Sequence, residues 1–66
     1  MDYTYSIVYA SDFQPIAQDG SNDFDHETIA HIRRDNMDNS DELEVVRVDP
    51  NGHICYRDGI KWIKVS

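Results

Sequence analysis

The sequence predicts a small α+β domain in which one helix packs on one face of an antiparallel sheet of four to five strands, in the order β-α-β-β-β. Three observations predict this fold class. The N-terminal segment alternates with the period of a strand, residues 25–36 carry apolar residues with the period of a helix, and residues 43–66 are rich in β-formers and divided by two turn signals. A chain of 66 residues supports one modest core, so we expect a single domain over residues 1–66.

The first strand is predicted at residues 3–9, where one face carries Tyr3, Tyr5, Ile7 and Tyr9. Polar and turn-forming residues in segment 11–22 predict a loop. Within this loop, residues 14–18 are a candidate fifth strand at the sheet edge, although Pro15 lacks the N–H group that a ladder requires.

The helix is predicted from Asp25 to Asn36, with Asp23 and Asp25 as candidate N-caps. Acidic residues in the first turn suit the positive end of the helix dipole. A rotation of about 100° per residue defines one broad arc that we expect to face the sheet, made of His26, Ile29, Ala30, Ile32, Arg33 and Met37.

Residues 43–66 are predicted to form a three-stranded antiparallel meander. Asp49–Gly52 offers proline at the first corner and glycine where a three-residue hairpin needs positive φ. Asp58 and Gly59 suit a two-residue hairpin turn of the primed type, in which both central residues need positive φ. With these turns Val48 lies opposite Ile54, Val46 opposite Tyr56, Ile54 opposite Ile63, Tyr56 opposite Lys61, and Cys55 beside Trp62.

The meander therefore has two faces of different character. We expect the helix to cover the face made of Val46, Val48, Ile54, Tyr56, Ile63 and Val65. The other face carries Leu43, Val45, Arg47, His53, Cys55, Arg57, Ile60, Trp62 and Lys64.

The net charge of −7 is unevenly distributed. Eleven acids and three arginines give residues 12–49 a charge of −8, whereas two lysines and one arginine against one aspartate give residues 50–66 a charge of +2. Direct binding to nucleic acid is disfavoured, because such sites need basic clusters that displace counterions. The acids either keep a small protein soluble or form a surface that binds a basic partner.

Three groups of residues resemble metal-binding or catalytic sites in part, and none predicts an enzyme or a cofactor. His26 and His31 are five apart and diverge on a helix, whereas a zinc-protease helix needs histidines four apart. Segment 19–25 lacks the glycine and glutamate of an EF-hand loop, which leaves an Asx-turn or a weak calcium site. Cys55 has His53 nearby but no third partner, so a structural cysteine is expected and no metal site is predicted.

Two candidate surfaces remain for binding. The acidic one comprises Asp19, Asp23, Asp25, Glu27, Asp35, Asp38, Asp41 and Glu42. The second lies on the sheet face around Trp62, with Arg47, Ile60 and Val45, because tryptophan and arginine are enriched at interface hot spots. The second surface is either covered within the monomer or forms a partner or homodimer contact. Within the monomer the N-terminal strand or the loop at residues 13–16 would fold over it, or Arg47 would stack on Trp62.

The run Glu44–Gly52 followed by Tyr56–Trp62, after an N-terminal strand and one helix, is similar to small phage-encoded anti-CRISPR proteins of the type I class. The likeness covers roughly the last 40 residues. It implies a non-enzymatic inhibitor that occupies the basic, nucleic-acid-handling surface of a host defence complex. The second interpretation is a homodimeric structural or regulatory domain joined through the Trp62 face.

The compartment is expected to be the cytoplasm, which is the host cytoplasm for a phage-encoded protein. Residues 1–5 have neither a basic segment nor a long apolar run, so neither a signal peptide nor a membrane span is predicted. A single cysteine and no disulfide framework fit a reducing environment.

Overall fold

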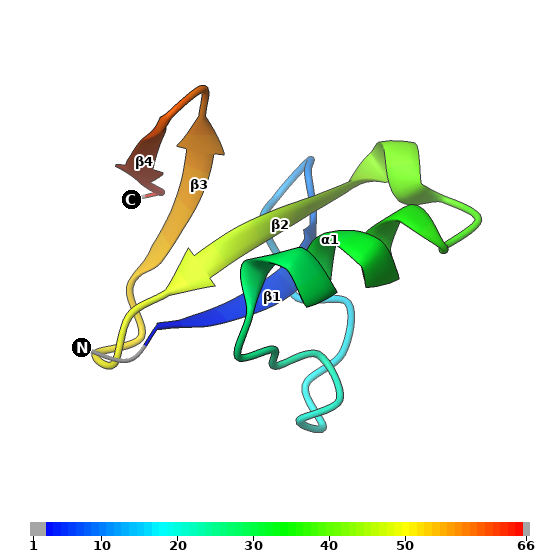
Figure 1. Cartoon of the computed structure of the whole chain (residues 1–66), viewed down its shortest axis with the longest axis horizontal. Coiled ribbons are helices and arrows are strands. Elements are labelled where there is room, and N and C mark those ends of the chain that lie inside the picture. Colours follow the sequence, from blue (N-terminus) through cyan, green and yellow to red (C-terminus); the bar gives the residue numbers. More distant parts are fainter. Residues whose placement is uncertain (1–2, 66) are drawn as a thin grey trace.

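A computed structural model describes residues 3–65 of the chain. Its elements are β1 (Thr4–Tyr9), α1 (Glu27–Asp35), a 3₁₀ turn (Ser40–Glu42), β2 (Leu43–Val48), β3 (Ile54–Asp58) and β4 (Lys61–Lys64). The strands form one antiparallel sheet in the order β1-β2-β3-β4, with α1 packed on it (Figure 1). The predicted fold class is confirmed. Ser66, which ends the predicted meander, lies outside the described residues, as do Met1 and Asp2.

The proposed fifth strand at residues 14–18 does not form. Pro15 makes a single antiparallel bridge with Val8, and the sheet keeps four strands. Proline carries no N–H group and so cannot continue a ladder in both directions. Within residues 3–65 the structure has no helix with the length and apolar character that a membrane crossing requires.

The main core lies between α1 and the β1–β2 pair. Ile7 of β1 stands opposite Val45 of β2, and both are buried in one cluster with Ala30 of α1 and with Leu43. Partly buried side chains complete this cluster, namely Tyr5, Ile16, Phe24 and Met37. The helix therefore covers the sheet face opposite to the predicted one, because β1 presents its own large apolar side chains on the side of Leu43 and Val45.

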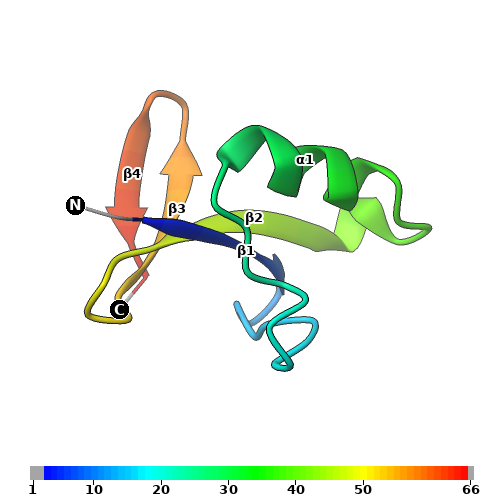
Figure 2. The same ribbon diagram turned by 60° about the horizontal axis from the view of Figure 1, so that its bottom comes forward.

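The face that carries Val46 is covered as well. Figure 2 shows α1 on one side of the β1–β2 pair and the loop after β1 on the other. Val8 and Val46 are fully buried, and the ring of Phe13 from this loop lies 5.5 Å from that of Tyr56. Two layers of covering chain let a small sheet bury residues on both of its faces.

The outer edge of β1 is closed by the same loop. Tyr5 and Phe24 exchange two backbone hydrogen bonds of 2.8 Å, and the N–H group of Tyr9 donates to the carbonyl oxygen of Gln14 at 2.9 Å. Backbone groups that would otherwise be exposed at a sheet edge are thus paired without a regular strand.

Asn22 completes this closure with its side chain. Its Nδ2 donates to the carbonyl oxygen of Ile7 at 2.8 Å, and the N–H group of Ile7 donates to Asn22 Oδ1 at 3.1 Å. Asn22 is only 4% exposed. The carboxamide supplies the donor and acceptor that a neighbouring strand would supply, a role that was not predicted from the sequence.

Helix α1 begins later than predicted and presents a different face. Its N-cap is His26, in extended conformation and without a side-chain capping bond, so neither Asp23 nor Asp25 is the N-cap. Ala30 is buried, whereas Ile29 is 47% and Ile32 is 55% exposed. The predicted arc is therefore wrong for the two isoleucines, whereas its members Ala30 and Met37 do pack against the core.

The orientation of α1 is set by contacts of its polar residues. Glu27 accepts a hydrogen bond from Arg57, and Arg34 donates to the carbonyl oxygen of Leu43. Glu27, Ala30 and Arg34 are three or four positions apart and share one helix face, so these bonds turn that face toward the sheet.

The hairpin between β2 and β3 matches its prediction. The carboxylate of Asp49 accepts hydrogen bonds from the N–H groups of Asn51 at 3.0 Å and His53 at 2.8 Å. Gly52 has φ of 86°, in the left-handed region that glycine enters at least cost. The predicted pairs of Val46 with Tyr56 and Val48 with Ile54 are confirmed.

The β3–β4 hairpin has a register two residues away from the predicted one. Asp58 pairs with Lys61, and the turn residues are Gly59 and Ile60. Gly59 has φ of 65° and Ile60 does not have positive φ, as a type II′ turn requires. The predicted turn needed positive φ at Asp58 also, which is costly for a residue with a side chain. The observed pairs are Cys55 with Lys64, Tyr56 with Ile63, and Arg57 with Trp62.

Candidate functional site

The acidic residues selected from the sequence lie before, within and after α1. Asp19, Asp23 and Asp25 belong to the loop that precedes the helix, while Asp35 ends it. Asp38, Asp41 and Glu42 follow in the connection to β2. All of these seven are exposed, and Glu27 at the start of α1 is partly buried. Figure 1 shows the two acidic segments at opposite ends of the helix.

Most of this charge is uncompensated within the described chain. Asp35 pairs with its neighbour Arg34, at 3.1 Å from Nη1 to Oδ1, and Glu27 pairs with Arg57 and His31. Among residues 3–65, the other six acids have no cationic group within ion-pair distance: Asp19, Asp23, Asp25, Asp38, Asp41 and Glu42. We name these six residues the acidic surface.

Asp19 forms an Asx-turn in the loop before the helix. Its Oδ1 accepts hydrogen bonds from the hydroxyl of Ser21 at 2.6 Å and from the N–H group of Ser21 at 3.0 Å. The side-chain bond, followed by the backbone bond, lowers the pKa of Asp19 below its ordinary value. Within residues 3–65 no three potential metal ligands converge. Of the two interpretations of segment 19–25, the Asx-turn is the one that the geometry displays.

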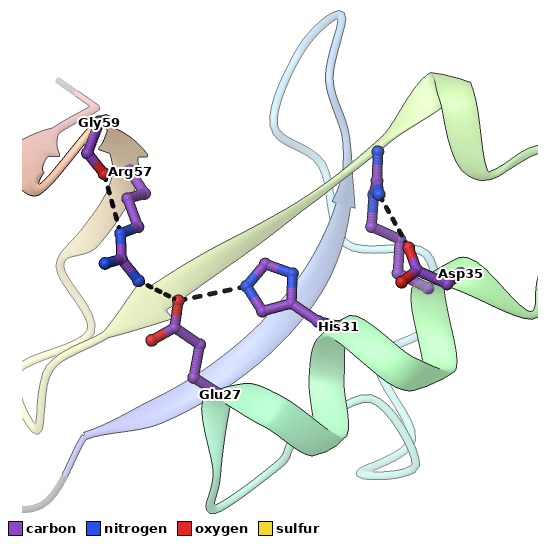
Figure 3. Close-up of polar contacts among 6 residues, drawn as sticks. Glu27, His31, Asp35, Arg57 and Gly59 are labelled. Atoms are coloured by element: carbon purple, nitrogen blue, oxygen red, sulfur yellow. Dashed lines mark hydrogen bonds and ion pairs between the residues drawn. The ribbon is translucent and has the colours of Figure 1, made fainter.

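Glu27 is the centre of a polar network that joins α1 to β3 (Figure 3). Its Oε2 accepts a hydrogen bond from Arg57 Nη1 at 2.9 Å and lies 3.2 Å from His31 Nε2. Arg57 Nε also donates to the carbonyl oxygen of Gly59 at 3.0 Å. The guanidinium thereby connects the start of the helix with the β3–β4 turn, and the partly buried Glu27 carboxylate is paired with groups of the same chain.

The pKa of Glu27 reflects this arrangement. Burial acts to raise it, but the hydrogen bonds with His31 and Arg57 and the charges of those two residues together outweigh burial. The pKa of Glu27 is therefore lowered from its ordinary value, and its charged form is stabilised in the folded state.

The second candidate surface is largely an internal stack. The guanidinium carbon of Arg47 lies 4.1 Å from the ring centroid of Tyr3 and 4.7 Å from that of Trp62. The rings of Tyr5 and Trp62 are 6.2 Å apart, and Arg57 lies 5.8 Å from the Trp62 ring. Planar cations over aromatic rings are favourable contacts, and here they leave Trp62 half-buried.

The members of this surface have different environments. Val45 is 3% exposed in the main core, which removes it from any contact surface of the folded chain. Ile60 is 89% exposed at the tip of the β3–β4 turn. Arg47 Nε is buried and has no hydrogen-bond partner among residues 3–65. The alternative of Arg47 stacked on Trp62 is confirmed, and the homodimer through this face stays a prediction.

The remaining candidates for chemistry lie apart from the acidic surface. Cys55 is a half-buried free thiol that stands opposite Arg47 and Lys64 in the sheet. His53 Nδ1 lies 3.2 Å from Asp49 Oδ2, and the bonds from His53 lower the pKa of Asp49. The Asp49–His53 contacts belong to the β2–β3 turn, and Cys55 occupies a position within the sheet.

Comparisons with protein-family models, with curated proteins and with solved structures returned no match for this chain.

Proposed function

We propose that this protein is a small non-enzymatic inhibitor that binds a basic protein surface through its acidic surface. The observation that carries the proposal is that six exposed acids around α1 have no ion-pair partner among residues 3–65. Complementary charge steers the encounter with a basic partner and suppresses association with acidic ones.

Two apolar side chains give this region a contact centre. Ile29 and Ile32 are both about half exposed on the outer side of α1, three positions apart. Interfaces between proteins combine apolar anchors with a polar rim, and residues at this spacing serve as anchors when a helix lies in a groove. The two isoleucines would supply affinity, and the acids around them would supply selectivity.

The class of partner follows from the charge and from the resemblance to type I anti-CRISPR proteins. A basic surface that handles nucleic acid attracts an acidic protein of this size, and occupation of that surface excludes the nucleic acid. A phage-encoded chain would perform this role in the host cytoplasm. Inhibition would then require no bond-making step.

The direct test uses purified type I CRISPR effector complexes and labelled target duplex DNA. The protein is expected to prevent DNA binding in a mobility-shift assay, and its inhibition should weaken as salt rises, because screening slows association. The double variant Asp38→Asn/Asp41→Asn should inhibit less than the wild type.

A matched control separates a specific surface from net charge. Glu44→Gln/Asp58→Asn changes the net charge by the same amount outside the acidic surface and should inhibit like the wild type. Equal loss in both double variants, inhibition that is indifferent to salt, or absence of inhibition across the panel of complexes would contradict the proposal. Direct binding of the protein to the free duplex would contradict it as well.

A further inference from the structure

The two edges of the sheet differ in whether their outward backbone groups are paired. The outer edge of β1 is paired with loop backbone and with the Asn22 side chain. Strand β4 forms the other edge, and no backbone group among residues 3–65 pairs with its outer side. The molecule therefore presents one open edge in the part of the chain that the structure describes.

The register identifies the groups that this edge offers. The N–H group of Val65 donates to the carbonyl oxygen of Ile54, so Val65 points its N–H group toward β3. Backbone direction alternates along an antiparallel strand, which turns the N–H and C=O groups of Trp62 and Lys64 away from β3. These groups have the geometry that an added strand would pair with.

The side chains beside the open edge are basic on both faces of the sheet. Lys61 and Lys64 are exposed and three positions apart, so they extend to opposite faces. Between them Trp62 and Ile63 are half-buried and retain apolar area that an added strand would cover. The segment 50–66 that contains this edge carries a net charge of +2 in a chain of −7.

We propose that the β4 edge binds an extended acidic segment of a partner protein, which adds to the sheet as a fifth strand. The backbone groups of Trp62 and Lys64 hold the segment, and Lys61 and Lys64 select acidic side chains on its two faces. This surface is separate from the acidic surface of the proposed function and has the opposite charge. The protein thereby joins two partners of unlike charge.

Charge also decides against a second copy as the occupant. Pairing of two β4 strands brings four lysines to one junction, and like charges near one another across strands are unfavourable. Lysine at a strand edge is a known protection against self-pairing, and the same residue favours an acidic strand.

The test follows the backbone amides of the isotope-labelled full chain by NMR during titration with a synthetic peptide. The probe is the acetylated and amidated heptapeptide Val-Glu-Thr-Val-Glu-Thr-Val, whose glutamates have the same spacing as the two lysines. Its control carries lysine at both glutamate positions. We expect the acidic peptide to shift the amide signals of Trp62 and Lys64 and to slow their hydrogen exchange, and the basic peptide to do neither.

Charge reversal provides the second arm. The variant Lys61→Glu/Lys64→Glu should invert the preference, with affinity for the acidic peptide lowered about tenfold and the basic peptide now bound. The variant Asp38→Asn/Asp41→Asn should bind the acidic peptide like the wild type, because its substitutions lie on the other surface.

Four results would overturn the proposal. The first is that the β4 amides do not respond to the acidic peptide. The second is that both peptides give the same response, and the third is that the response lies on α1 instead. In the fourth, Trp62 and Lys64 become protected without peptide as protein concentration rises, which identifies a second copy as the occupant.

Discussion

The carboxamide of Asn22 binds both backbone polar groups of Ile7 across fifteen positions of sequence. Ile7 is fully buried at the centre of β1, so its backbone groups on that side depend on Asn22 and on the N–H group of Ile16. The loop is thereby attached to the core strand by a side chain as well as by backbone bonds.

Replacement of Asn22 by alanine should lower the free energy of unfolding by about 2 kcal/mol, because it leaves a buried backbone donor without a partner. Urea unfolding measures this change, and hydrogen exchange at the Ile7 amide should accelerate. Asn39→Ala is the matched control, since Asn39 is exposed and makes no side-chain capping bond. Equal stability of the two variants would show that the Asn22 bonds contribute nothing.

The stack around Trp62 should contribute to stability within the monomer. Trp62→Ala is expected to lower the free energy of unfolding by about 2 kcal/mol, since the ring is half-buried against Arg47 and Tyr5. Arg47→Lys keeps the charge but removes the planar group and should lower it by about 1 kcal/mol.

Ile60→Ala serves as the control for the stack, because Ile60 is almost fully exposed and its loss should change stability by less than about 0.5 kcal/mol. Acrylamide quenching of Trp62 fluorescence provides an independent measurement and should be weaker than for the unfolded chain. Suppose that quenching is as strong as in the unfolded chain and that Trp62→Ala does not change the free energy of unfolding. The Trp62 side chain would then be a candidate partner contact and not part of a stabilising stack.

The β3–β4 turn should depend on the conformation of Gly59. A Cβ atom there meets no heavy atom within 4 Å outside Gly59 and its two chain neighbours, so the strain of a side chain at positive φ is the effect to expect. We expect Gly59→Val to lower the free energy of unfolding by about 1 kcal/mol or more. Ile60→Val changes the other turn residue and should be nearly neutral. Thermal unfolding distinguishes the two, and an unchanged melting temperature for Gly59→Val would contradict the turn assignment.

The network at Glu27 should make stability fall in acid. Because the folded-state pKa of Glu27 is lowered, its contribution is present above the unfolded pKa of 4.5 and is lost as pH falls through the folded value. Glu27→Gln should therefore lower the urea midpoint near neutral pH, and the difference from the wild type should shrink toward zero in acid.

Glu42→Gln is the control for this experiment, since Glu42 is exposed and has no ion-pair partner among residues 3–65. Its midpoint near neutral pH should stay close to that of the wild type. A difference between Glu27→Gln and wild type that is the same at every pH would mean that the network does not stabilise the charged carboxylate.

The elements whose signals are local could be predicted from the sequence. The prediction of the β2–β3 hairpin was correct because Asp49 and Gly52 themselves supply the hydrogen bonds and the positive φ that the turn needs. The β3–β4 register was wrong by two residues, and an even slip keeps every side chain on its face. The apolar pattern therefore cannot distinguish the two registers, and only the φ values of the turn residues do.

Contacts between segments that are far apart in the sequence could not be predicted in this way. The orientation of α1 depends on bonds of Glu27 to Arg57 and of Arg34 to Leu43, which no helical periodicity contains. The exposure of the acids in the acidic surface could be predicted from their charge. The ion pair of Glu27 could not, because its partner Arg57 lies thirty positions away in the sequence. The role of Asn22 has no sequence signature, since an asparagine between turn residues usually indicates only a loop.

Closure of the β1 edge also bears on behaviour at high concentration. Growth of a fibril by strand addition needs an acceptor edge at both sides of every molecule, so that each newcomer offers a fresh template to the next. A molecule that attached through β4 would turn its occupied β1 side outward and give the following molecule nothing to pair with. Strand-mediated self-assembly of the native domain would therefore terminate after one step, and the protein is expected to stay free of thioflavin-positive aggregate while it remains folded.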